Sequence, residues 1–252
     1  MNSPKSENPV ALITGASVRI GEAIAKRLFE GGYNLILHYR NSQEKAEALA
    51  AEFNSVRPDS AMLVSGHLDD SSEIMQIISY VNETKNLFGG RLDVLVNSAS
   101  MFYPTPMSEA SILQWDELVN TNLRAPFLLA QGFAETLKAN NGCIVNITDI
   151  YGDRPLEEHP IYSMTKAGLI SLTKSLAKEL APEVRTNAIS PGAILWPERE
   201  ANDTDYHAKI LAQVPLNRLG RVENISETVW FLVTNDYING QIIAIDGGKS
   251  IY

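Results

Sequence analysis

A short apolar run near the start of the chain leads into a glycine-bearing turn, in the stretch Val10-Ala11-Leu12-Ile13-Thr14-Gly15-Ala16-Ser17-Val18-Arg19-Ile20-Gly21. An amphipathic segment follows, so the pattern predicts a buried strand, a tight turn and a helix. Gly15 would make the turn, and Gly21 would let the helix lie close to the strand. Backbone N–H groups at the start of such a helix bind a pyrophosphate. Two glycines alone are weak evidence, since the same turn also occurs for purely structural reasons.

The rest of the chain repeats the alternation of short apolar runs with longer amphipathic stretches. This alternation is typical of βαβ units that build a parallel sheet. Strands are expected at 10–14, 34–39, 62–66, 94–97, 143–148, 185–189 and 242–245. Helices are expected at 20–30, 42–54, 71–88, 113–138, 161–180 and 225–233. We therefore predict one α/β domain over residues 1–252, with residues 1–8 flexible and a polar substrate loop at 194–208 that could act as a lid.

The composition excludes several classes of function. The chain has 252 residues, and 44% of them are hydrophobic, which is enough for one substantial core. With 21 Lys and Arg against 30 Asp and Glu, the net charge is −9, and no basic block is present. Nucleic acid is therefore not an expected partner. The four histidines lack the spacing of metal ligands, so we predict no metal site.

The cysteine count and the start of the chain bear on localisation. Cys143 is the only cysteine, and it lies in an apolar run where it is expected to be a small core residue. The first nine residues are polar, and no later stretch is apolar enough to span a bilayer. We expect a cytoplasmic protein with no membrane partner.

The end of the second predicted strand suggests which dinucleotide the first turn would bind. An NAD site usually presents an acid there for the ribose hydroxyls, whereas this chain has His38-Tyr39-Arg40-Asn41-Ser42. Arg19 and Arg40 could converge on a 2′-phosphate, with Ser42 and His38 adding hydrogen bonds. This predicts NADPH as cofactor. The alternative is that Arg40 is only a solvated charge in a turn, which predicts no preference over NADH.

Tyr162 and Lys166 form the most specific local signal. They are four residues apart at the start of a predicted helix and so share one face. A protonated Lys166 would stabilise the tyrosinate and lower the pKa of Tyr162, which would make its hydroxyl a usable proton donor. Taken alone, a tyrosine and a lysine at this spacing are more often a surface pair.

The pair does not stand alone in this chain. It follows the glycine turn, the strand end Asn97-Ser98-Ala99, a helix carrying Asn122 and a strand ending in Asp149. With these motifs the chain resembles the short-chain dehydrogenase/reductase family from Val10 to Asp246-Gly247-Gly248. The resemblance implies a Rossmann-type, doubly wound fold with a seven-stranded parallel sheet flanked by helices. It also implies hydride transfer from a nicotinamide cofactor.

The resemblance carries roles over to individual residues. It implies a catalytic group of Asn122, Asp149, Tyr162 and Lys166, in which Asn122 holds a water chain to Lys166. Lys166 would also hold the nicotinamide ribose. Residues expected to bind the cofactor are Gly15, Arg19, Ile20, Gly21, His38, Tyr39, Arg40, Ser42, Leu68, Asn97, Ala99, Ser100, Tyr162, Lys166, Pro191 and Gly192.

Asp149 separates this chain from most carbonyl-reducing relatives, which place a serine there to donate a hydrogen bond to the substrate oxygen. An ionised aspartate cannot donate one. Beside Tyr162 it suits a substrate with ring nitrogens that need protons, either by sharing a proton with the phenol or by raising the pKa of the phenol. The alternatives are that Thr148 takes over the role of the serine, or that Asp149 only caps a turn.

Several segments resemble pteridine reductases in particular, including dihydromonapterin reductases. These segments are Thr14 to Gly21, Leu37-His38-Tyr39, Thr148-Asp149 and Ser100-Met101-Phe102-Tyr103-Pro104-Thr105-Pro106. The likeness implies that Phe102 stacks on a flat pterin, and that Arg19 contacts both cofactor and pterin. The substrate contacts would come from Arg19, Phe102, Asp149 and Tyr162. Phe102 could instead be a loop aromatic packed on the core.

The resulting hypothesis is NADPH-dependent reduction of a dihydropterin, such as dihydrobiopterin or dihydromonapterin, and of dihydrofolate, to the tetrahydro form. The first alternative is a carbonyl or 3-oxoacyl-carrier-protein reductase, and the second is a non-catalytic NADPH-sensing regulator. The family likeness also implies a homotetramer. Departures are His67-Leu68, which lacks the usual acid toward adenine, and Ser98 and Ser100, which replace an asparagine and a glycine.

Overall fold

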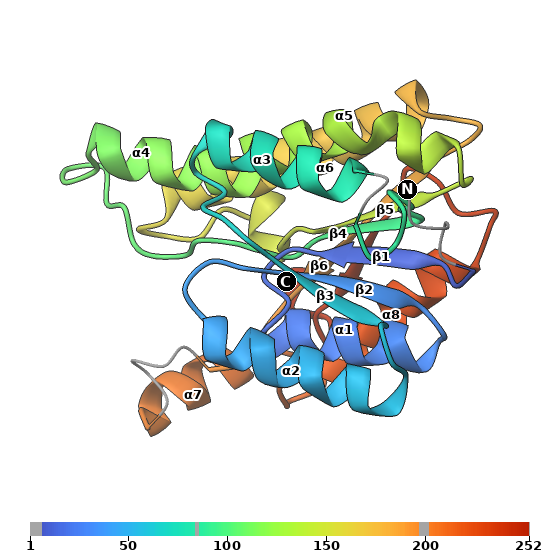
Figure 1. The fold of residues 1–252 in the computed structure, drawn as a ribbon. Helices are drawn as coiled ribbons and strands as arrows, with labels where there is room; N and C mark the ends of the chain where they lie inside the picture. The colour runs from blue at the N-terminus through green and yellow to red at the C-terminus, as the bar shows by residue number, and fades with distance from the viewer. Residues whose placement is uncertain (1–6, 84–85, 197–201, 252) are drawn as a thin grey trace.

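The computed structural model describes residues 7–83, 86–196 and 202–251 of the chain (Figure 1). Its centre is an all-parallel, seven-stranded sheet in the order β3-β2-β1-β4-β5-β6-β7. The strands are β1 (Val10–Ile13), β2 (Asn34–Tyr39), β3 (Ala61–Ser65), β4 (Val94–Asn97), β5 (Cys143–Ile147), β6 (Arg185–Pro191) and β7 (Ile242–Ile245). The predicted single α/β domain with a Rossmann-type, seven-stranded parallel sheet is confirmed.

Helices cover both faces of the sheet. In Figure 1, α1 (Arg19–Glu30), α2 (Gln43–Val56) and α8 (Val222–Thr234) lie on one face. On the other face lie α3 (Ser71–Asn82), α4 (Ile112–Val119), α5 (Ala125–Lys138) and α6 (Pro160–Glu179). Two short helices, η2 (Ile150–Gly152) and η4 (Lys249–Ile251), lie near the ends of β5 and β7. The doubly wound arrangement follows from the alternation that the sequence shows.

β1 shows how the sequence builds two cores. Its side chains alternate between the faces of the sheet, as in any strand. Ala11 and Ile13 pack into the cluster with α1 and α8, whereas Val10 and Leu12 pack into the cluster with α3 and α5. All four residues are fully buried, which is why this strand is a continuous apolar run.

Two of the predicted helices differ from the structure. The helix expected at 71–88 ends at Asn82. The side-chain amide of Asn86 donates to the carbonyls of Tyr80 and Val81 at 3.1 and 2.7 Å, and so occupies acceptors that a continued helix would use. The helix expected at 113–138 is interrupted by a π-helical turn, η1 (Asn120–Arg124), in which the Ala125 N–H bonds to the Asn120 carbonyl. This turn places Asn122 next to the site described below.

The segment expected to be a substrate loop, 194–208, also contains a helix. α7 (Thr204–Leu211) begins after Asp203, whose carboxylate accepts a hydrogen bond from the Tyr206 N–H at 2.8 Å. An aspartate in that place is a normal helix start, so the sequence carried the signal. Residues 197–201 of this segment, and most of the predicted flexible segment 1–8, lie outside the described residues.

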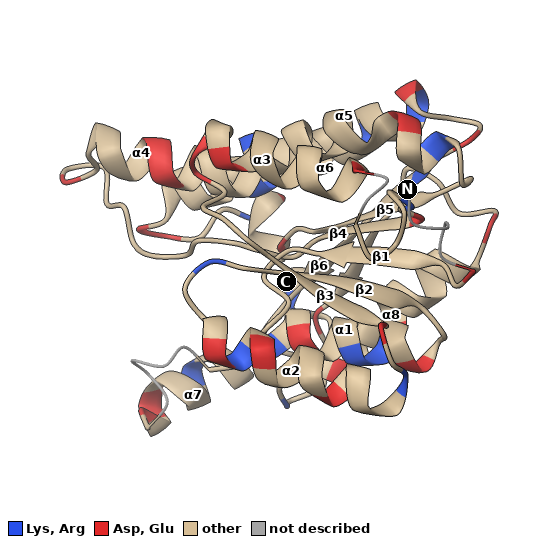
Figure 2. Ribbon diagram, in the orientation of Figure 1, with Lys and Arg blue, Asp and Glu red and all other residues tan. Residues whose placement is uncertain are grey.

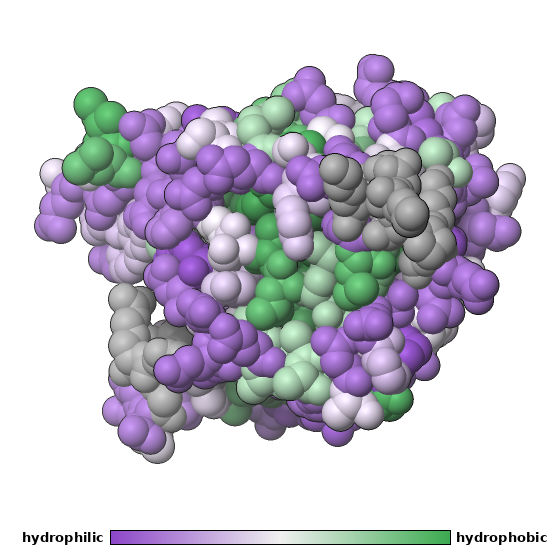
Figure 3. Space-filling model, in the orientation of Figure 1, coloured by the Kyte–Doolittle hydropathy of each residue, from purple (hydrophilic) through white to green (hydrophobic). Residues whose placement is uncertain are grey.

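The surface of the domain carries charges of both signs and some exposed apolar side chains. Lys and Arg are interspersed with Asp and Glu along the outer helices (Figure 2), and green side chains gather at the outer end of α4 (Figure 3). Ile112 and Leu113, at the start of α4, are each 80% exposed, and Met107 in the loop before this helix is 83% exposed. Among the described helices, none is long and apolar enough to cross a membrane.

Candidate active site

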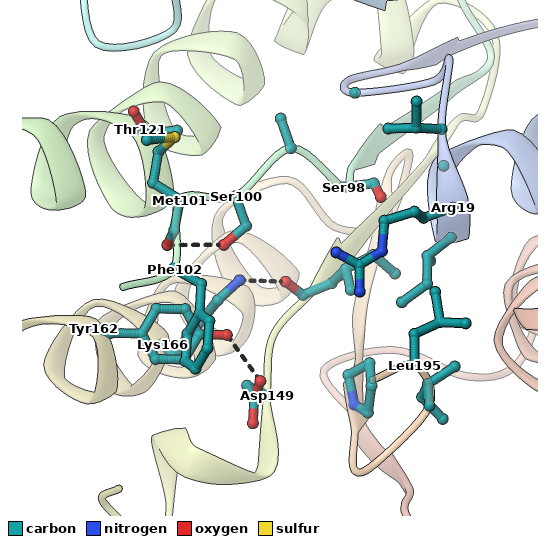
Figure 4. A pocket seen from close by; sticks show the side chains of 18 of the residues that line it. Arg19, Ser98, Ser100, Met101, Phe102, Thr121, Asp149, Tyr162, Lys166 and Leu195 are labelled. Atoms are coloured by element: carbon teal, nitrogen blue, oxygen red, sulfur yellow. Dashed lines mark hydrogen bonds between the residues drawn. The ribbon is translucent and has the colours of Figure 1, made fainter. Parts of the chain in front are cut away.

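A cavity of about 850 Å³ runs along the carboxyl ends of the strands, where the strand order changes direction between β1 and β4. This edge is where open parallel sheets bind ligands. The walls come from the turn after β1, the ends of β2, β4, β5 and β6, and the start of α6. In Figure 4, Arg19 lies on one side of the cavity and Asp149, Tyr162, Lys166 and Phe102 on the other.

Asp149 and Tyr162 are joined by a hydrogen bond at the centre of the cavity wall. The Tyr162 hydroxyl donates to Oδ2 of Asp149 at 2.8 Å (Figure 4). Oδ1 of Asp149 accepts from the backbone N–H of Tyr151 at 2.9 Å and so caps the helix η2. The turn-capping alternative is therefore correct in its geometry, but the same carboxylate also contacts the phenol.

Burial governs the ionisation of this pair. Desolvation raises the pKa of Asp149, and the hydrogen bonds from Tyr151 and Tyr162 only partly oppose it. Desolvation also raises the pKa of Tyr162 well above its ordinary value, and the charge of Asp149 adds to the rise. Both shifts favour states in which the pair holds a proton between its two oxygens.

Lys166 is 2% exposed, and its Nζ donates to the carbonyl of Ile147 at 3.0 Å. It lies over the face of the Tyr162 ring, 5.6 Å from the ring centroid. Burial lowers the pKa of Lys166 to about 8. The pKa of Tyr162 is raised in this structure and not lowered, contrary to the prediction from the sequence, because burial of the phenol and the charge of Asp149 dominate it.

Asn122 acts on the loop after β4. Its Oδ1 accepts from the Met101 N–H at 2.8 Å and from the Ser100 hydroxyl at 3.1 Å, and its Nδ2 donates to the Met101 carbonyl at 2.9 Å. The side chain therefore fixes the backbone next to Phe102. Asn122 is not among the residues that line the cavity, and its role in a water chain stays a prediction.

Phe102 faces the cavity. Its ring is 43% exposed, stacks on His159 at a centroid distance of 4.8 Å, and meets the Tyr162 ring edge-on at 4.8 Å. The same loop is tied to the start of α6 by a bond from the Thr105 N–H to the Glu158 carbonyl at 2.7 Å. The alternative of a loop aromatic packed on the core does not describe this side chain.

The other end of the cavity presents a helix start. No side chain caps α1, whose N-cap is Val18. A Cβ on Gly21 would lie 2.1 Å from the Gly15 carbonyl oxygen, so only glycine lets the helix start this close to the turn. Arg19, Tyr39, Arg40, Ser42 and Leu68 line the cavity beside it. Free N–H groups and two guanidinium side chains fit an anionic, phosphate-bearing cofactor.

His38 does not fit its expected role. Its Nδ1 accepts from the Gly15 N–H at 3.2 Å, and its Nε2 bonds to the Gly66 carbonyl at 3.0 Å. Burial lowers its pKa to about 4, so the ring is neutral at pH 7. With both nitrogens engaged, His38 is a brace between the glycine turn and the end of β3, not a ligand of a 2′-phosphate.

Two further expectations differ from the structure. Asn97 does not line the cavity: it is buried, and its Nδ2 donates to Oδ1 of Asn146 at 2.8 Å. Thr148 cannot replace the missing serine, because its hydroxyl is held by the Ile189 carbonyl at 2.8 Å and by Ser190 at 2.7 Å. The other residues expected at the cofactor all line the cavity.

A family model described as enoyl-(acyl carrier protein) reductase matches residues 15–250. The chain belongs to the short-chain dehydrogenase/reductase family.

Relatives within the short-chain dehydrogenase/reductase family carry the names of two activities. The 3-oxoacyl-(acyl-carrier-protein) reductase of Staphylococcus aureus strain Mu50 is 36% identical over 242 residues, covering 94% of this chain and 96% of the relative. That of Aquifex aeolicus is 36% identical over 248 residues, covering 97% and 98%. Pteridine reductase 1 of Leishmania tarentolae is 34% identical over 283 residues, covering 96% of each chain. The broader resemblance is confirmed, and the narrower one to pteridine reductases stays a prediction.

The cavity-lining residues that sequence reasoning missed include three with titratable side chains close to the Asp149–Tyr162 pair, namely Tyr151, His159 and Lys249. Tyr151 follows Asp149 by two residues, and Lys249 follows a pair of glycines that turns the chain back, so each had a weak local signal. Nothing in the sequence pairs them. Among the residues that the structure describes, no group of three His, Cys, Asp or Glu side chains is placed to hold a metal ion.

Lys166→Met is expected to stabilise the protein at pH 7. The folded-state pKa of about 8, against 10.5 for an ordinary lysine, corresponds to a cost of about 3 kcal/mol at low pH. The unfolded chain binds more protons between these values, so the wild-type protein gains stability as pH rises through them. The advantage of the variant should therefore shrink from pH 7 to pH 10, as urea unfolding would show.

The exposed Lys174→Met on the same helix is the matched control and should show no such pH dependence. A Lys166→Met variant that is less stable than the wild type at pH 7, or whose advantage does not change with pH, would contradict the assigned burial cost.

Proposed function

We propose that the chain is an NADPH-dependent reductase that delivers hydride and a proton to a small planar substrate. When bound, the reduced nicotinamide supplies the hydride. The residues of this chain would bind and orient the cofactor. Arg19, Arg40 and Ser42 would hold the 2′-phosphate, and the backbone N–H groups at the start of α1 would hold the pyrophosphate. Pro191, the last residue of β6, and Gly192, which follows it, line the cavity where the nicotinamide carboxamide is expected.

The proton would come from the Asp149–Tyr162 pair. The 2.8 Å hydrogen bond places one proton between a carboxylate and a phenol, both with raised pKa values. Such a pair can pass a proton to a substrate nitrogen and recover it from solvent. Lys166 holds positive charge beside the pair and fixes the end of β5 through the Ile147 carbonyl.

The geometry favours a dihydropterin as substrate. The observation that carries this is Asp149 in hydrogen-bond contact with Tyr162. Both a ketone and a ring nitrogen need a proton, but an ionised Asp149 cannot donate the additional hydrogen bond that a serine gives to a ketone oxygen, whereas the pair can relay a proton to a ring nitrogen. The exposed Phe102 ring, fixed by His159 behind it, offers a flat apolar face on which a planar heterocycle can stack. The cavity volume of about 850 Å³ holds such a ring together with a dinucleotide.

The comparisons favour a second candidate, a 3-oxoacyl-carrier-protein reductase. The relatives named as 3-oxoacyl-carrier-protein reductases are 36% identical to this chain, whereas the pteridine reductase is 34% identical. The pteridine reductase still covers a similar share of this chain, 96% against 94% for the reductase of Staphylococcus aureus. The aspartate at position 149 stands against the second candidate, since Thr148 is engaged with β6 and leaves no serine-like donor there.

Steady-state assays with a common NADPH concentration separate the two candidates. Dihydrobiopterin and dihydromonapterin should be turned over with a higher kcat/KM than acetoacetyl-CoA. Asp149→Ser should lower pterin turnover by about 100-fold, as expected for removal of a general acid–base group. A wild-type enzyme that reduces only the ketone, and an Asp149→Ser variant that keeps full activity, would assign the chain to the second candidate.

Arg40→Ala tests the cofactor preference. Loss of a charge-assisted hydrogen bond to the 2′-phosphate should lower kcat/KM for NADPH by about 10- to 100-fold and leave kcat/KM for NADH unchanged. Lys45→Ala, an exposed cation on α2 that does not line the cavity, is the control. If Arg40→Ala lowers both values equally, or neither, Arg40 is a solvated charge in a turn.

A further inference from the structure

A second tyrosine–lysine pair lines the same cavity and has no role in the reaction proposed above. Tyr151 lies in η2, directly after the end of β5, and Lys249 lies in η4, near the end of the chain. Nζ of Lys249 donates to the Tyr151 hydroxyl oxygen at 3.0 Å and lies 5.4 Å from the centroid of that ring. Both residues line the cavity together with Asp149 and Tyr162.

The turn after β7 places Lys249 in the wall of the cavity. Gly247 and Gly248 have φ values of 64° and 88°, a left-handed turn that folds the chain back after β7. The Asp246 carboxylate accepts from the Gly248 N–H at 2.9 Å and from the Ser250 N–H at 2.6 Å. Arg154 donates to the Ser250 carbonyl at 2.9 Å and holds the segment against η2. The position of Lys249 is therefore fixed by the backbone.

The burial of Lys249 is only partly compensated: desolvation lowers its pKa, and the nearby charges of Asp149 and Asp246 oppose that shift without reversing it. Its side chain is only 9% exposed, and burying an ammonium group costs free energy unless it is paired with a charge. Within the described part of the chain, its hydrogen-bond partner is a neutral phenol, and no carboxylate forms an ion pair with it. A cost of this kind points to a use inside the cavity.

The Tyr151 hydroxyl has a proton to offer. Its oxygen accepts from Lys249, and the two oxygens of Asp149 are already bonded to the Tyr151 N–H and the Tyr162 hydroxyl. Among the described residues no acceptor takes the Tyr151 O–H. Burial and the charge of Asp149 raise the pKa of Tyr151 to about 12, so the phenol keeps its proton at neutral pH.

We propose that the Tyr151 hydroxyl, with its oxygen held by Lys249, donates a hydrogen bond to a carbonyl-type oxygen of the substrate. This inference rests on the proposed reductase function and adds a substrate contact to it. It supplies the hydroxyl donor that Asp149 cannot supply when ionised. Tyr151 is the residue that contacts the substrate, and Lys249 is a positioning residue that acts through it. The oxygen can be the ring carbonyl of a pterin or the ketone of an acyl substrate.

Tyr151→Phe removes the donor and keeps the ring. With the substrate that the wild-type enzyme turns over best, kcat/KM should fall about tenfold or more, whereas the dissociation constant for NADPH stays within about twofold. Lys249→Met should lower kcat/KM in the same direction. The double variant should lose no more than Tyr151→Phe alone, because the two side chains act as one unit. Tyr237→Phe and Lys174→Met, both on the surface, are the matched controls.

Measurements with two kinds of ligand identify the substrate oxygen that accepts the hydrogen bond from Tyr151. If the partner is the pterin ring carbonyl, 2,4-diaminopteridine, which has an amino group in its place, should bind the wild-type protein and Tyr151→Phe equally well. If the partner is a ketone, acetoacetyl-CoA turnover should show the loss. An enzyme that reduces no pterin refutes the first candidate function, while the effect of Tyr151→Phe can still be measured on the ketone.

The inference is overturned by an unchanged kcat/KM in Tyr151→Phe. It is also overturned if the double variant loses the product of the two single losses, since the residues would then act independently. Equal losses of NADPH affinity and melting temperature in both variants would assign the pair a purely structural role.

Discussion

The hydrogen bond between Tyr162 and Asp149 is the interaction on which the site depends. It joins the start of α6 to the end of β5, and the Lys166 bond to the Ile147 carbonyl joins the same two elements one turn further along. The loop that carries Phe102 is attached to this unit through Glu158 and through ring contacts with His159 and Tyr162. A shift of α6 would therefore move the proton donor, the cation and the aromatic wall together.

The sheet explains why these groups meet. Seven parallel strands end at one edge, and the strand order changes direction between β1 and β4, so the turns after the strands open a cavity there. One end of the cavity is an uncapped helix start with two arginines, and the other is a buried acid–phenol pair. The two ends suit a charged cofactor and a neutral, proton-accepting substrate. The separation follows from topology and not from any single motif.

Much of this arrangement could be predicted from the sequence, because the spacing of apolar residues and the residues that begin and end helices and turns are local properties of the chain. The strands, the glycine turn and the Tyr162–Lys166 spacing all follow from neighbours along the chain. What could not be predicted depends on contacts between distant residues. His38 became a brace because Gly15 and Gly66 occupy both ring nitrogens. The rise in the pKa of Tyr162 depends on its burial and on the nearby Asp149, which only the tertiary structure establishes. The hydrogen bond from Lys249 to Tyr151 likewise joins residues that are 98 positions apart in the sequence.

The central claim is that burial keeps a proton on the Asp149–Tyr162 pair. Carbon-13 NMR of the Asp149 carboxyl, assigned with Asp149→Asn, measures it directly. We expect the carboxyl to titrate above its ordinary pKa of 3.8, and to titrate higher still in Tyr162→Phe, because the hydrogen bond from the phenol lowers the value. A carboxyl that titrates at or below 3.8, or that is unaffected by Tyr162→Phe, would contradict the claim.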